Sequence, residues 1–380
     1  MSERRAHAII DLSALQRNFL RTRELSGRRD VIAVVKADAY GHGAISVARS
    51  LEAAGCRRFG VVTPEEGCEL RESGIVGDIL VMGGMTTGRD AQLSADCKLC
   101  PVIHSEEDLD LAREAGEIAS RPMGVEIEVD TGMQRMGVAH QEATSMVRAV
   151  SEDPRLSLDG VYTHFAHADA EEQTASLSQI NAFRSLIEEW QELGIRPASI
   201  HASNSSALHA GHILLNALPE ATAIRPGLML YGATSVDRED PDRAFQPVMS
   251  VRTRVAAVRN LLRGDGVGYG STWRAESSTR VATLSLGYAD GVPRVLSNRG
   301  QVWLAGAPRP IVGRVSMDYL AVELGDASVH VGDLATYFGP SAGGGPGIRV
   351  EKQAEWAGTI AYELLTGVGN RVYREPVGGT

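Results

Sequence analysis

The chain has 380 residues and a formal net charge of −10, with 43% hydrophobic and 23% charged residues. This is the balance of an ordinary soluble protein, long enough for a large domain and a smaller one. The acidic charge argues against a nucleic-acid partner, because binding a phosphate backbone requires a basic face. No apolar run approaches the roughly eighteen residues of a membrane span, and the N-terminus lacks the apolar core of a secretory signal. We therefore expect a cytoplasmic protein.

Short β-branched runs alternate with amphipathic stretches from Val31 to Arg225. Helical periodicity is clearest at Ala44–Ala54, Glu106–Ala115 and Ser178–Leu193. The strand candidates are Val31–Lys36, Phe59–Thr63, Asp78–Met82, Lys98–Ile103, Gly124–Val129, Asp159–Thr163, Ala198–Ala202 and Ala221–Arg225. Each strand is followed by a helix, except in a less clear last unit. The pattern predicts an α/β fold with a (β/α)8 TIM-like barrel over residues 11–235.

After Gly232 the pattern changes to alternating strands with glycine-containing turns. A charged connector at Asp237–Asp242 precedes them. The strand candidates here are Val248–Arg259, Thr279–Leu286, Gln301–Trp303, Pro310–Val315 and Leu320–Leu324. We predict a mostly β C-terminal domain over residues 236–380, to which residues 1–10 add a strand at Arg4–Ile10.

Four cysteines are too few for a disulfide framework in a chain of this length. Cys97 and Cys100 form a C-x-x-C pair, with His104 shortly after it. A zinc or redox site usually requires a second pair, or a motif at the start of a helix. We therefore predict that Cys97–Ile103 is a short buried strand and that the protein holds no metal.

Polar residues stand where the predicted barrel strands end, and this end carries the chemistry in such a fold. They are Lys36, Asp130, Arg135, His164, Asn204, Ser205 and Arg225. Lys36 closes the apolar run Val31–Val35 and would point into the barrel mouth. Burial lowers the pKa of an ammonium group and favours the neutral amine that forms a Schiff base. The alternative is a surface lysine at a strand end.

Lys36 lies in the segment VVKADAYGHG (residues 34–43), and seven further motifs follow it in order. They are DTGMQRMG (130–137), THFAHAD (163–169), HASNS (201–205), IRPG (224–227), GYGSTW (268–273), GYADGVPR (287–294) and GRVSMD (313–318). Over essentially its whole length the chain resembles the alanine racemase family of pyridoxal-phosphate enzymes of fold type III. The resemblance implies interconversion of L- and D-alanine for peptidoglycan, in a head-to-tail homodimer with composite active sites.

The resemblance also assigns the two bases that racemisation requires, one on each face of the substrate. Lys36 holds pyridoxal 5'-phosphate as an aldimine and handles the Cα proton on the D side. Tyr269, contributed by the other subunit, is the base on the L side, and His164 bonds this tyrosine. Because the ordinary pKa of tyrosine is about 10, nearby cations must lower it.

The remaining contacts follow from the same resemblance. Arg225 faces the pyridine nitrogen, and because its guanidinium keeps its proton, it favours racemisation over transamination. The cofactor-binding residues are Lys36, Tyr40, His164, Asn204, Ser205, Arg225, Gly227, Leu228 and Tyr362. Glycine at position 227 allows the backbone to approach the phosphate closely. The substrate-binding residues are Arg135, Met317, Asp318 and Tyr288.

Glu128 departs from the family pattern, in which many members have a lysine at this position that carbon dioxide converts to a carbamate. A carboxylate is also a planar anion that suits an arginine, so we expect Glu128 to pair with Arg135 without modification. Because the glutamate stem is shorter by several atoms, a bridging water or a shifted Arg135 is expected to fill the gap. Glu126, Glu128 and Asp130 alternate along one strand and share a face, where Arg135 is the expected counter-ion. Ser316 stands where cysteine is common.

Three alternatives stay open. A pyridoxal-phosphate homeostasis protein has a related barrel but lacks the β domain and therefore Tyr269. A decarboxylase of the same fold type places a carboxylate, rather than Arg225, beside the pyridine nitrogen. A broad-specificity or serine racemase is the more serious competitor, although Tyr362 favours alanine over larger side chains.

Overall fold

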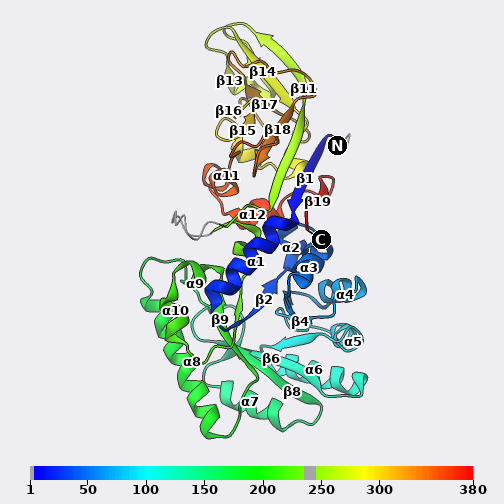
Figure 1. Cartoon of the computed structure of the whole chain (residues 1–380), viewed down its shortest axis with the longest axis vertical. Coiled ribbons are helices and arrows are strands. Elements are labelled where there is room, and N and C mark those ends of the chain that lie inside the picture. The colour runs from blue at the N-terminus through cyan, green and yellow to red at the C-terminus, as the bar shows by residue number, and fades with distance from the viewer. Residues whose placement is uncertain (1–3, 235–244, 380) are drawn as a thin grey trace.

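The computed structural model of the chain describes residues 4–234 and 245–379. The connector predicted at Asp237–Asp242 lies outside these residues. Figure 1 shows an elongated molecule with a helix-covered barrel at one end and a body of strands at the other. None of the described helices is long and apolar enough to cross a membrane.

Eight parallel strands form the barrel, and each predicted strand overlaps one of them. The spatial order is β5–β4–β3–β2–β10–β9–β8–β6, and pairing of β5 with β6 closes the ring. The strands are β2 (Asp30–Val34), β3 (Arg58–Val61), β4 (Asp78–Val81), β5 (Cys100–Ile103), β6 (Met123–Asp130), β8 (Leu156–Tyr162), β9 (Ser199–Asn204) and β10 (Ala223–Arg225). A two-residue strand, β7 (Val138–Ala139), pairs with β6. The predicted TIM-like barrel is therefore confirmed.

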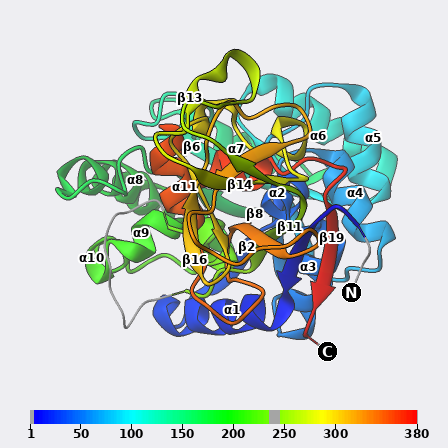
Figure 2. The ribbon, with the colours of Figure 1, turned by 90° about the horizontal axis from the view of Figure 1, so that it is seen from above.

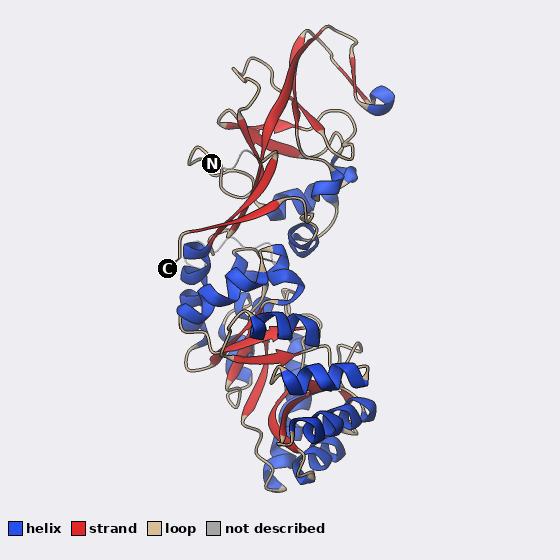
Figure 3. Ribbon diagram, turned by 90° about the vertical axis from the view of Figure 1, so that its right-hand side faces the viewer, coloured by secondary structure: helices blue, strands red, loops and turns tan. Residues whose placement is uncertain are grey.

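Helices cover the outside of this barrel (Figure 3), and short helical segments such as α2 (Lys36–Gly41) lie at its mouth. They are α1 (Leu12–Ser26), α2 (Lys36–Gly41), α3 (Ala44–Ala53), α4 (Pro64–Glu72), α5 (Gly88–Asp96), α6 (Glu106–Ala119), α7 (Ala143–Glu152), α8 (Thr174–Glu192), α9 (Ser205–His209), α10 (His212–Ala217) and the 3₁₀ helix η1 (Leu228–Tyr231). Helix α8 shows why such segments pack here. Its apolar residues Ile180, Phe183, Ile187 and Trp190 repeat at helical spacing and are all buried.

The second body is mostly β structure, as predicted. Its main sheet has the order β16–β15–β18–β11–β1–β19, with β14 paired to β11 and β17 to β14. The strands are β1 (Ala6–Asp11), β11 (Met249–Leu261), β14 (Thr279–Leu284), β15 (Gln301–Leu304), β16 (Ala307–Pro310), β17 (Leu320–Glu323), β18 (Leu334–Phe338) and β19 (Tyr373–Val377). Strand β1 runs antiparallel to β11 and parallel to β19, so both ends of the chain lie side by side in this sheet (Figure 2).

Shorter elements complete the second body. They are the hairpin β12 (Gly266–Val267) and β13 (Trp273–Arg274), the 3₁₀ helices η3 (Tyr269–Ser271), η4 (Tyr288–Asp290) and η5 (Arg294–Leu296), and the helices α11 (Val350–Ala357) and α12 (Ala361–Thr366). Helix α12 packs against α2 of the barrel, which brings the β domain to the barrel mouth.

The strand predicted at Pro310–Val315 is wrong. The chain is extended earlier, at β16, where Ala307–Pro310 pairs with Gln301–Leu304 across a tight turn. Beyond it Ile311 forms an isolated bridge to Val322, and Gly313 has a φ of +75°, which ends the extended run. Strands β18 and β19 were not predicted from the sequence.

The strand predicted at Cys97–Ile103 is also wrong at its start. Cys97 caps the end of α5, Lys98 has a φ of +52°, and β5 begins only at Cys100. Cys97 forms a disulfide with Cys68 of α4, whereas Cys100 is free. The described residues contain no cluster of His, Cys, Asp and Glu side chains that could hold a metal ion.

Candidate active site

Lys36 lies immediately beyond the first barrel strand, at the start of an unusual turn. Residues 37–40 are left-handed, with φ between 53° and 55°, and none of them is glycine. Each such residue costs about 1–2 kcal/mol, so the surroundings must hold the turn in place. Glu66 does so, because its carboxylate accepts from the Ala37 amide at 2.7 Å and from the Val62 amide at 2.8 Å.

The surroundings of Lys36 favour its neutral amine. The side chain is half-buried, and burial is the main cause that lowers the pKa of its ammonium group. The positive charges of Arg135 and Arg225 lower it further, while Glu66 and Glu128 oppose them. A lysine with this environment is suited to forming an imine and to exchanging a proton.

Arg225 ends the last barrel strand, and its guanidinium is buried in the barrel mouth. Nη2 donates to the Thr163 carbonyl at 2.8 Å and lies 3.4 Å from Nδ1 of His164. Cζ lies 4.2 Å above the centre of the Tyr162 ring, a cation–π contact. Burial and the charge of Arg225 lower the pKa of His164 to about 3, so this imidazole is neutral.

A chain of buried polar groups continues from Arg225 through the barrel core. Nη1 of Arg225 donates to Nδ1 of His201, so the proton of this imidazole is on Nε2, which donates to Glu126 at 2.8 Å. The other oxygen of Glu126 accepts from Arg58 at 2.6 Å. Burial raises the pKa of Glu126, but His201 and Arg58 outweigh it and keep the carboxylate ionised.

Ser205 and Gly227 form a small cradle between the last two strands. The Ser205 hydroxyl oxygen accepts from the amides of Gly227 at 2.9 Å and Met229 at 3.3 Å, which leaves its own proton to donate outward. A Cβ atom at position 227 would overlap the Tyr40 hydroxyl, so only glycine fits there. Asn204 caps α9 by accepting from the Ala207 amide at 3.0 Å and so holds Ser205 in place. The cradle suits a small anion such as a phosphate.

Tyr362 of α12, in the β domain, lies beside Tyr40, whose hydroxyl borders this cradle. Its ring centre lies 5.9 Å from that of Tyr40, which in turn lies 4.9 Å from that of Tyr231. Burial raises the pKa of Tyr40, so its hydroxyl stays protonated and can donate. Leu228 begins η1 directly after the cradle.

The candidate substrate residues of the β domain lie together on one loop pair. The Tyr288 amide donates to the Ser316 carbonyl at 2.9 Å, and the Ala289 amide donates to Met317 at 3.0 Å. Tyr288 and Met317 are 44% and 52% exposed. Asp318 accepts from Arg371 at 2.8 Å, so its carboxylate already has a counter-ion.

Tyr269 does not reach Lys36 of its own chain. It lies in η3 between β12 and β13, and Figure 1 shows β13 at the end of the β domain away from the barrel. The side chain is 73% exposed, which is unusual for a large aromatic residue.

A direct pairing of Glu128 with Arg135, as expected from the sequence, is wrong. The Glu128 carboxylate accepts from the Tyr162 hydroxyl at 2.9 Å and lies 3.2 Å from Nε2 of His104. Arg135 is exposed and forms no ion pair with Glu128 within residues 4–234 and 245–379. Asp130 instead accepts from the amide of Gly132 at 2.8 Å and stabilises the loop after β6. The shorter glutamate stem keeps its head group near the barrel wall.

Sequence reasoning missed three side chains that touch this region: His104, Tyr162 and His201. Their positions carried a signal, because His104 directly follows β5, Tyr162 ends β8 and His201 lies within β9. His201 also stands inside one of the recognised motifs. The sequence did not show which side chains of neighbouring strands would come together in the barrel.

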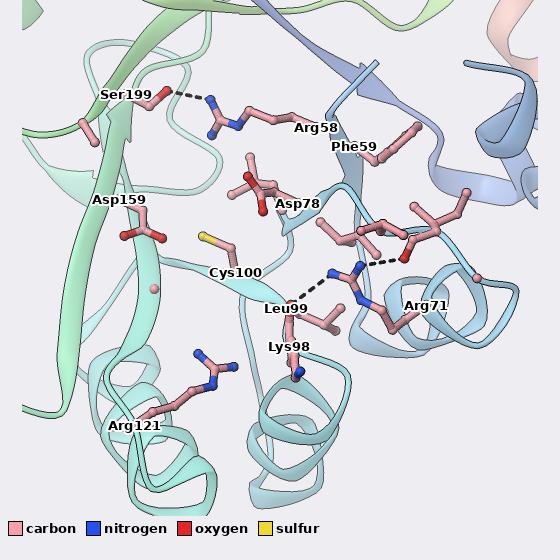
Figure 4. A pocket seen from close by; sticks show the side chains of 17 residues that line it. Arg58, Phe59, Arg71, Asp78, Lys98, Leu99, Cys100, Arg121, Asp159 and Ser199 are labelled. Atoms are coloured by element: carbon pink, nitrogen blue, oxygen red, sulfur yellow. Dashed lines mark hydrogen bonds between the residues drawn. The ribbon is translucent and has the colours of Figure 1, made fainter. Parts of the chain in front are cut away.

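A cavity of about 770 Å³ lies at the opposite end of the barrel (Figure 4). Residues at the beginnings of strands line it, among them Arg58, Asp78, Cys100 and Ser199. Figure 4 shows Arg58 joined to Ser199 there. Because barrel chemistry occurs at the ends of strands, this cavity is not the candidate active site.

Comparison with known proteins identifies the family. Residues 10–235 match the model of the alanine racemase N-terminal domain, and residues 248–376 match that of its C-terminal domain. The alanine racemase of Mycobacterium ulcerans is 39% identical over 97% of this chain and 95% of that protein. The alanine racemase of Sorangium cellulosum is 37% identical over 98% of this chain and 100% of that protein.

Solved structures of alanine racemases lead to the same family. The alanine racemase of Streptomyces lavendulae superposes with a TM-score of 0.90 at 34% identity, over 100% of this chain and 99% of that one. That of Bacillus anthracis with bound L-Ala-P superposes with a TM-score of 0.86 at 31% identity, over 98% and 95%. The chain therefore belongs to the alanine racemase family of amino-acid isomerases.

Proposed function

We propose that this protein interconverts L- and D-alanine with pyridoxal 5'-phosphate bound at Lys36. One observation carries the proposal furthest. A half-buried lysine with a lowered pKa stands at the mouth of the barrel, at the start of a strained left-handed turn. Strain of this kind is typical of functional sites, and the family comparisons give the reaction class.

The residues around Lys36 fit such a cofactor. The cradle of Ser205 and Gly227 would hold its phosphate, with Leu228, Tyr40 and Tyr362 beside it, and Asn204 would keep the cradle in shape. When bound, pyridoxal phosphate withdraws electrons from an attached amino acid and so acidifies its Cα–H.

Arg225 would decide which reaction follows. Its guanidinium is held by His201, Thr163 and the Tyr162 ring, and it remains a hydrogen-bond donor that does not release its proton. Beside the pyridine nitrogen of the cofactor, this guanidinium would give the ring no proton. This favours return of the proton to Cα over its transfer elsewhere, and so favours racemisation over transamination.

Two bases would exchange the Cα proton from opposite faces. Lys36 Nζ acts on the D side, and Tyr269 acts on the L side from a second copy of the chain. The exposure of Tyr269 and its distance from the barrel of its own chain support this arrangement. The composite site makes a homodimer the working unit, with the neutral imidazole of His164 as a hydrogen-bond partner for the tyrosine.

Arg135, Met317, Asp318 and Tyr288 would bind the substrate. Arg135 is exposed and not engaged by Glu128, so it is available to an incoming carboxylate. Tyr288 and Met317 are exposed on the β domain, as expected for groups that face the barrel of a second copy. We further propose that the product D-alanine supplies peptidoglycan synthesis in the cytoplasm.

A panel of amino acids tests the proposal. Protein loaded with pyridoxal phosphate is incubated separately with each enantiomer of alanine, serine and larger amino acids, and the products are resolved by chirality. We expect alanine to have the highest kcat/KM in both directions. A higher value for serine would favour the broad-specificity alternative, and no racemisation of any amino acid would refute the proposal.

A further inference from the structure

Glu128 stands in an unusual place for a charge. Its side chain is buried, and its carboxylate contacts the Tyr162 hydroxyl and the His104 ring rather than Arg135. Burial raises the pKa of this carboxyl, but His104 outweighs burial and lowers it. The direct partners of this buried carboxylate are therefore Tyr162 and His104 rather than Arg135.

His104 is fixed between two carboxylates. Nε2 lies 3.2 Å from Glu128, and Nδ1 lies 3.4 Å from Asp108, an ion-pair distance. Asp108 is itself held by the amides of His104 and Met85, both at 3.0 Å. A Cβ atom at Gly84 would lie 2.7 Å from Asp108 Oδ1 and 2.9 Å from His104 Nδ1, so glycine is required for this close packing. Two flanking carboxylates favour the imidazolium form.

Tyr162 connects this cluster to Arg225. Its hydroxyl donates to Glu128, and its ring is stacked on His201 with centres 4.9 Å apart and an angle of 14° between planes. The Arg225 guanidinium lies above the same ring, with Cζ at 4.2 Å. A hydrogen bond at the phenol end prevents the ring from shifting, and the ring in turn limits where the guanidinium can lie.

We propose that Asp108, His104, Glu128 and Tyr162 form a buried chain that positions Arg225, so that Glu128 serves the pyridine-nitrogen side of the site rather than the substrate carboxylate. The inference rests on the proposed function, in which Arg225 faces the cofactor ring. It makes His104 and Tyr162 positioning residues, acting through Arg225.

Two conservative variants test the chain: Tyr162→Phe keeps the ring and removes its hydroxyl, and Glu128→Gln keeps the shape and removes the charge. We expect kcat for alanine to fall about tenfold in both variants, while KM stays within about twofold. A fall of this size is typical when a hydrogen bond to a charged group is lost, and here that bond aligns Arg225 for the reaction. Pyruvate formed per racemisation event should rise. Tyr337→Phe is the matched control, because Tyr337 is a buried β-domain tyrosine whose hydroxyl has no hydrogen-bond partner among the described residues.

A second readout does not depend on activity. NMR signals of the arginine side chains are recorded in the full-length protein, with and without cofactor, and assigned by substitution. Both variants should move the Arg225 signal and leave that of Arg135 in place.

A rise in KM at unchanged kcat, with a shift of the Arg135 signal, would show that Glu128 serves the substrate carboxylate and would overturn the inference. Unchanged kinetics and signals would overturn it as well. If Glu128→Gln failed to fold, the kinetics and NMR signals of Tyr162→Phe alone would test the inference. A wild-type protein that did not racemise alanine would refute the proposed function instead, while the NMR shifts would still test the chain.

Discussion

Replacing His104 by Gln should change how the stability of the protein depends on pH. Burial lowers the pKa of His104, but Asp108 and Glu128 outweigh burial and raise it to about 9 from an ordinary value of 6.5. Each pKa unit corresponds to about 1.4 kcal/mol, so protonated His104 contributes roughly 3 kcal/mol to the free energy of unfolding.

The sign follows from the direction of the shift. Because the folded-state pKa is raised, this contribution is complete below pH 6.5 and is lost as pH rises toward 9. His42, His201 and His164 are shifted the other way, to about 4, 4 and 3, so they destabilise the fold only below pH 6.5. The two effects therefore occupy separate pH ranges.

Urea unfolding of the apoprotein, followed by tryptophan fluorescence at fixed protein concentration, measures the difference between wild type and His104→Gln. We expect the wild type to be more stable by about 3 kcal/mol at pH 6 and the gap to close near pH 9.5. His330→Gln is the control, since His330 is an exposed histidine 4.0 Å from Asp333. A gap that stayed constant or widened between pH 6 and 9.5 would show that the two carboxylates do not hold His104 protonated in the folded protein.

Three further predictions concern catalysis. Mixing inactive Lys36→Ala and Tyr269→Ala subunits should restore up to one working site per heterodimer; a mixture that stayed inactive in the racemase assay would place both bases in one chain. Arg225→Glu should slow racemisation and raise pyruvate formation per racemisation event, because a carboxylate can share a proton with the pyridine nitrogen. An unchanged ratio of pyruvate to racemisation would mean that Arg225 only binds the cofactor and does not direct the reaction. Wild-type activity should be the same with and without bicarbonate, because Glu128 is a permanent anion, and recovery on adding bicarbonate to carbon-dioxide-free buffer would argue against this.

Much of the fold could be predicted from periodicity alone. Few folds other than a (β/α)8 barrel accommodate eight β-branched runs separated by amphipathic helices. Lys36 could be placed at the barrel mouth because it ends an apolar run. The left-handed turn at residues 37–40 could not be foreseen, since none of these residues is glycine. Glu66, from helix α4, holds that turn, and such a contact cannot be recognised from the sequence around the turn.

The partners of Glu128 show more clearly what could not be predicted from the sequence. Alternation along β6 predicts correctly that Glu126 and Glu128 share a face, but not which side chains they contact. His104 directly follows β5 and Tyr162 ends β8, and these are the strands on either side of β6. Arg135 is close in sequence and was expected to be the counter-ion, but the glutamate stem is short and the neighbouring strands offer nearer donors.

The attachment of the cofactor to Lys36 can be tested directly, because the chain contains three lysines, Lys36, Lys98 and Lys352. Lys98 lines the cavity at the opposite end of the barrel, and Lys352 pairs with Glu355 at 2.7 Å. Protein loaded with pyridoxal phosphate is reduced with borohydride, digested and mapped by mass spectrometry. We predict a pyridoxyl group on Lys36 and none on the other two. A label on Lys98 or Lys352, or no label at all, would show that Lys36 does not carry the cofactor.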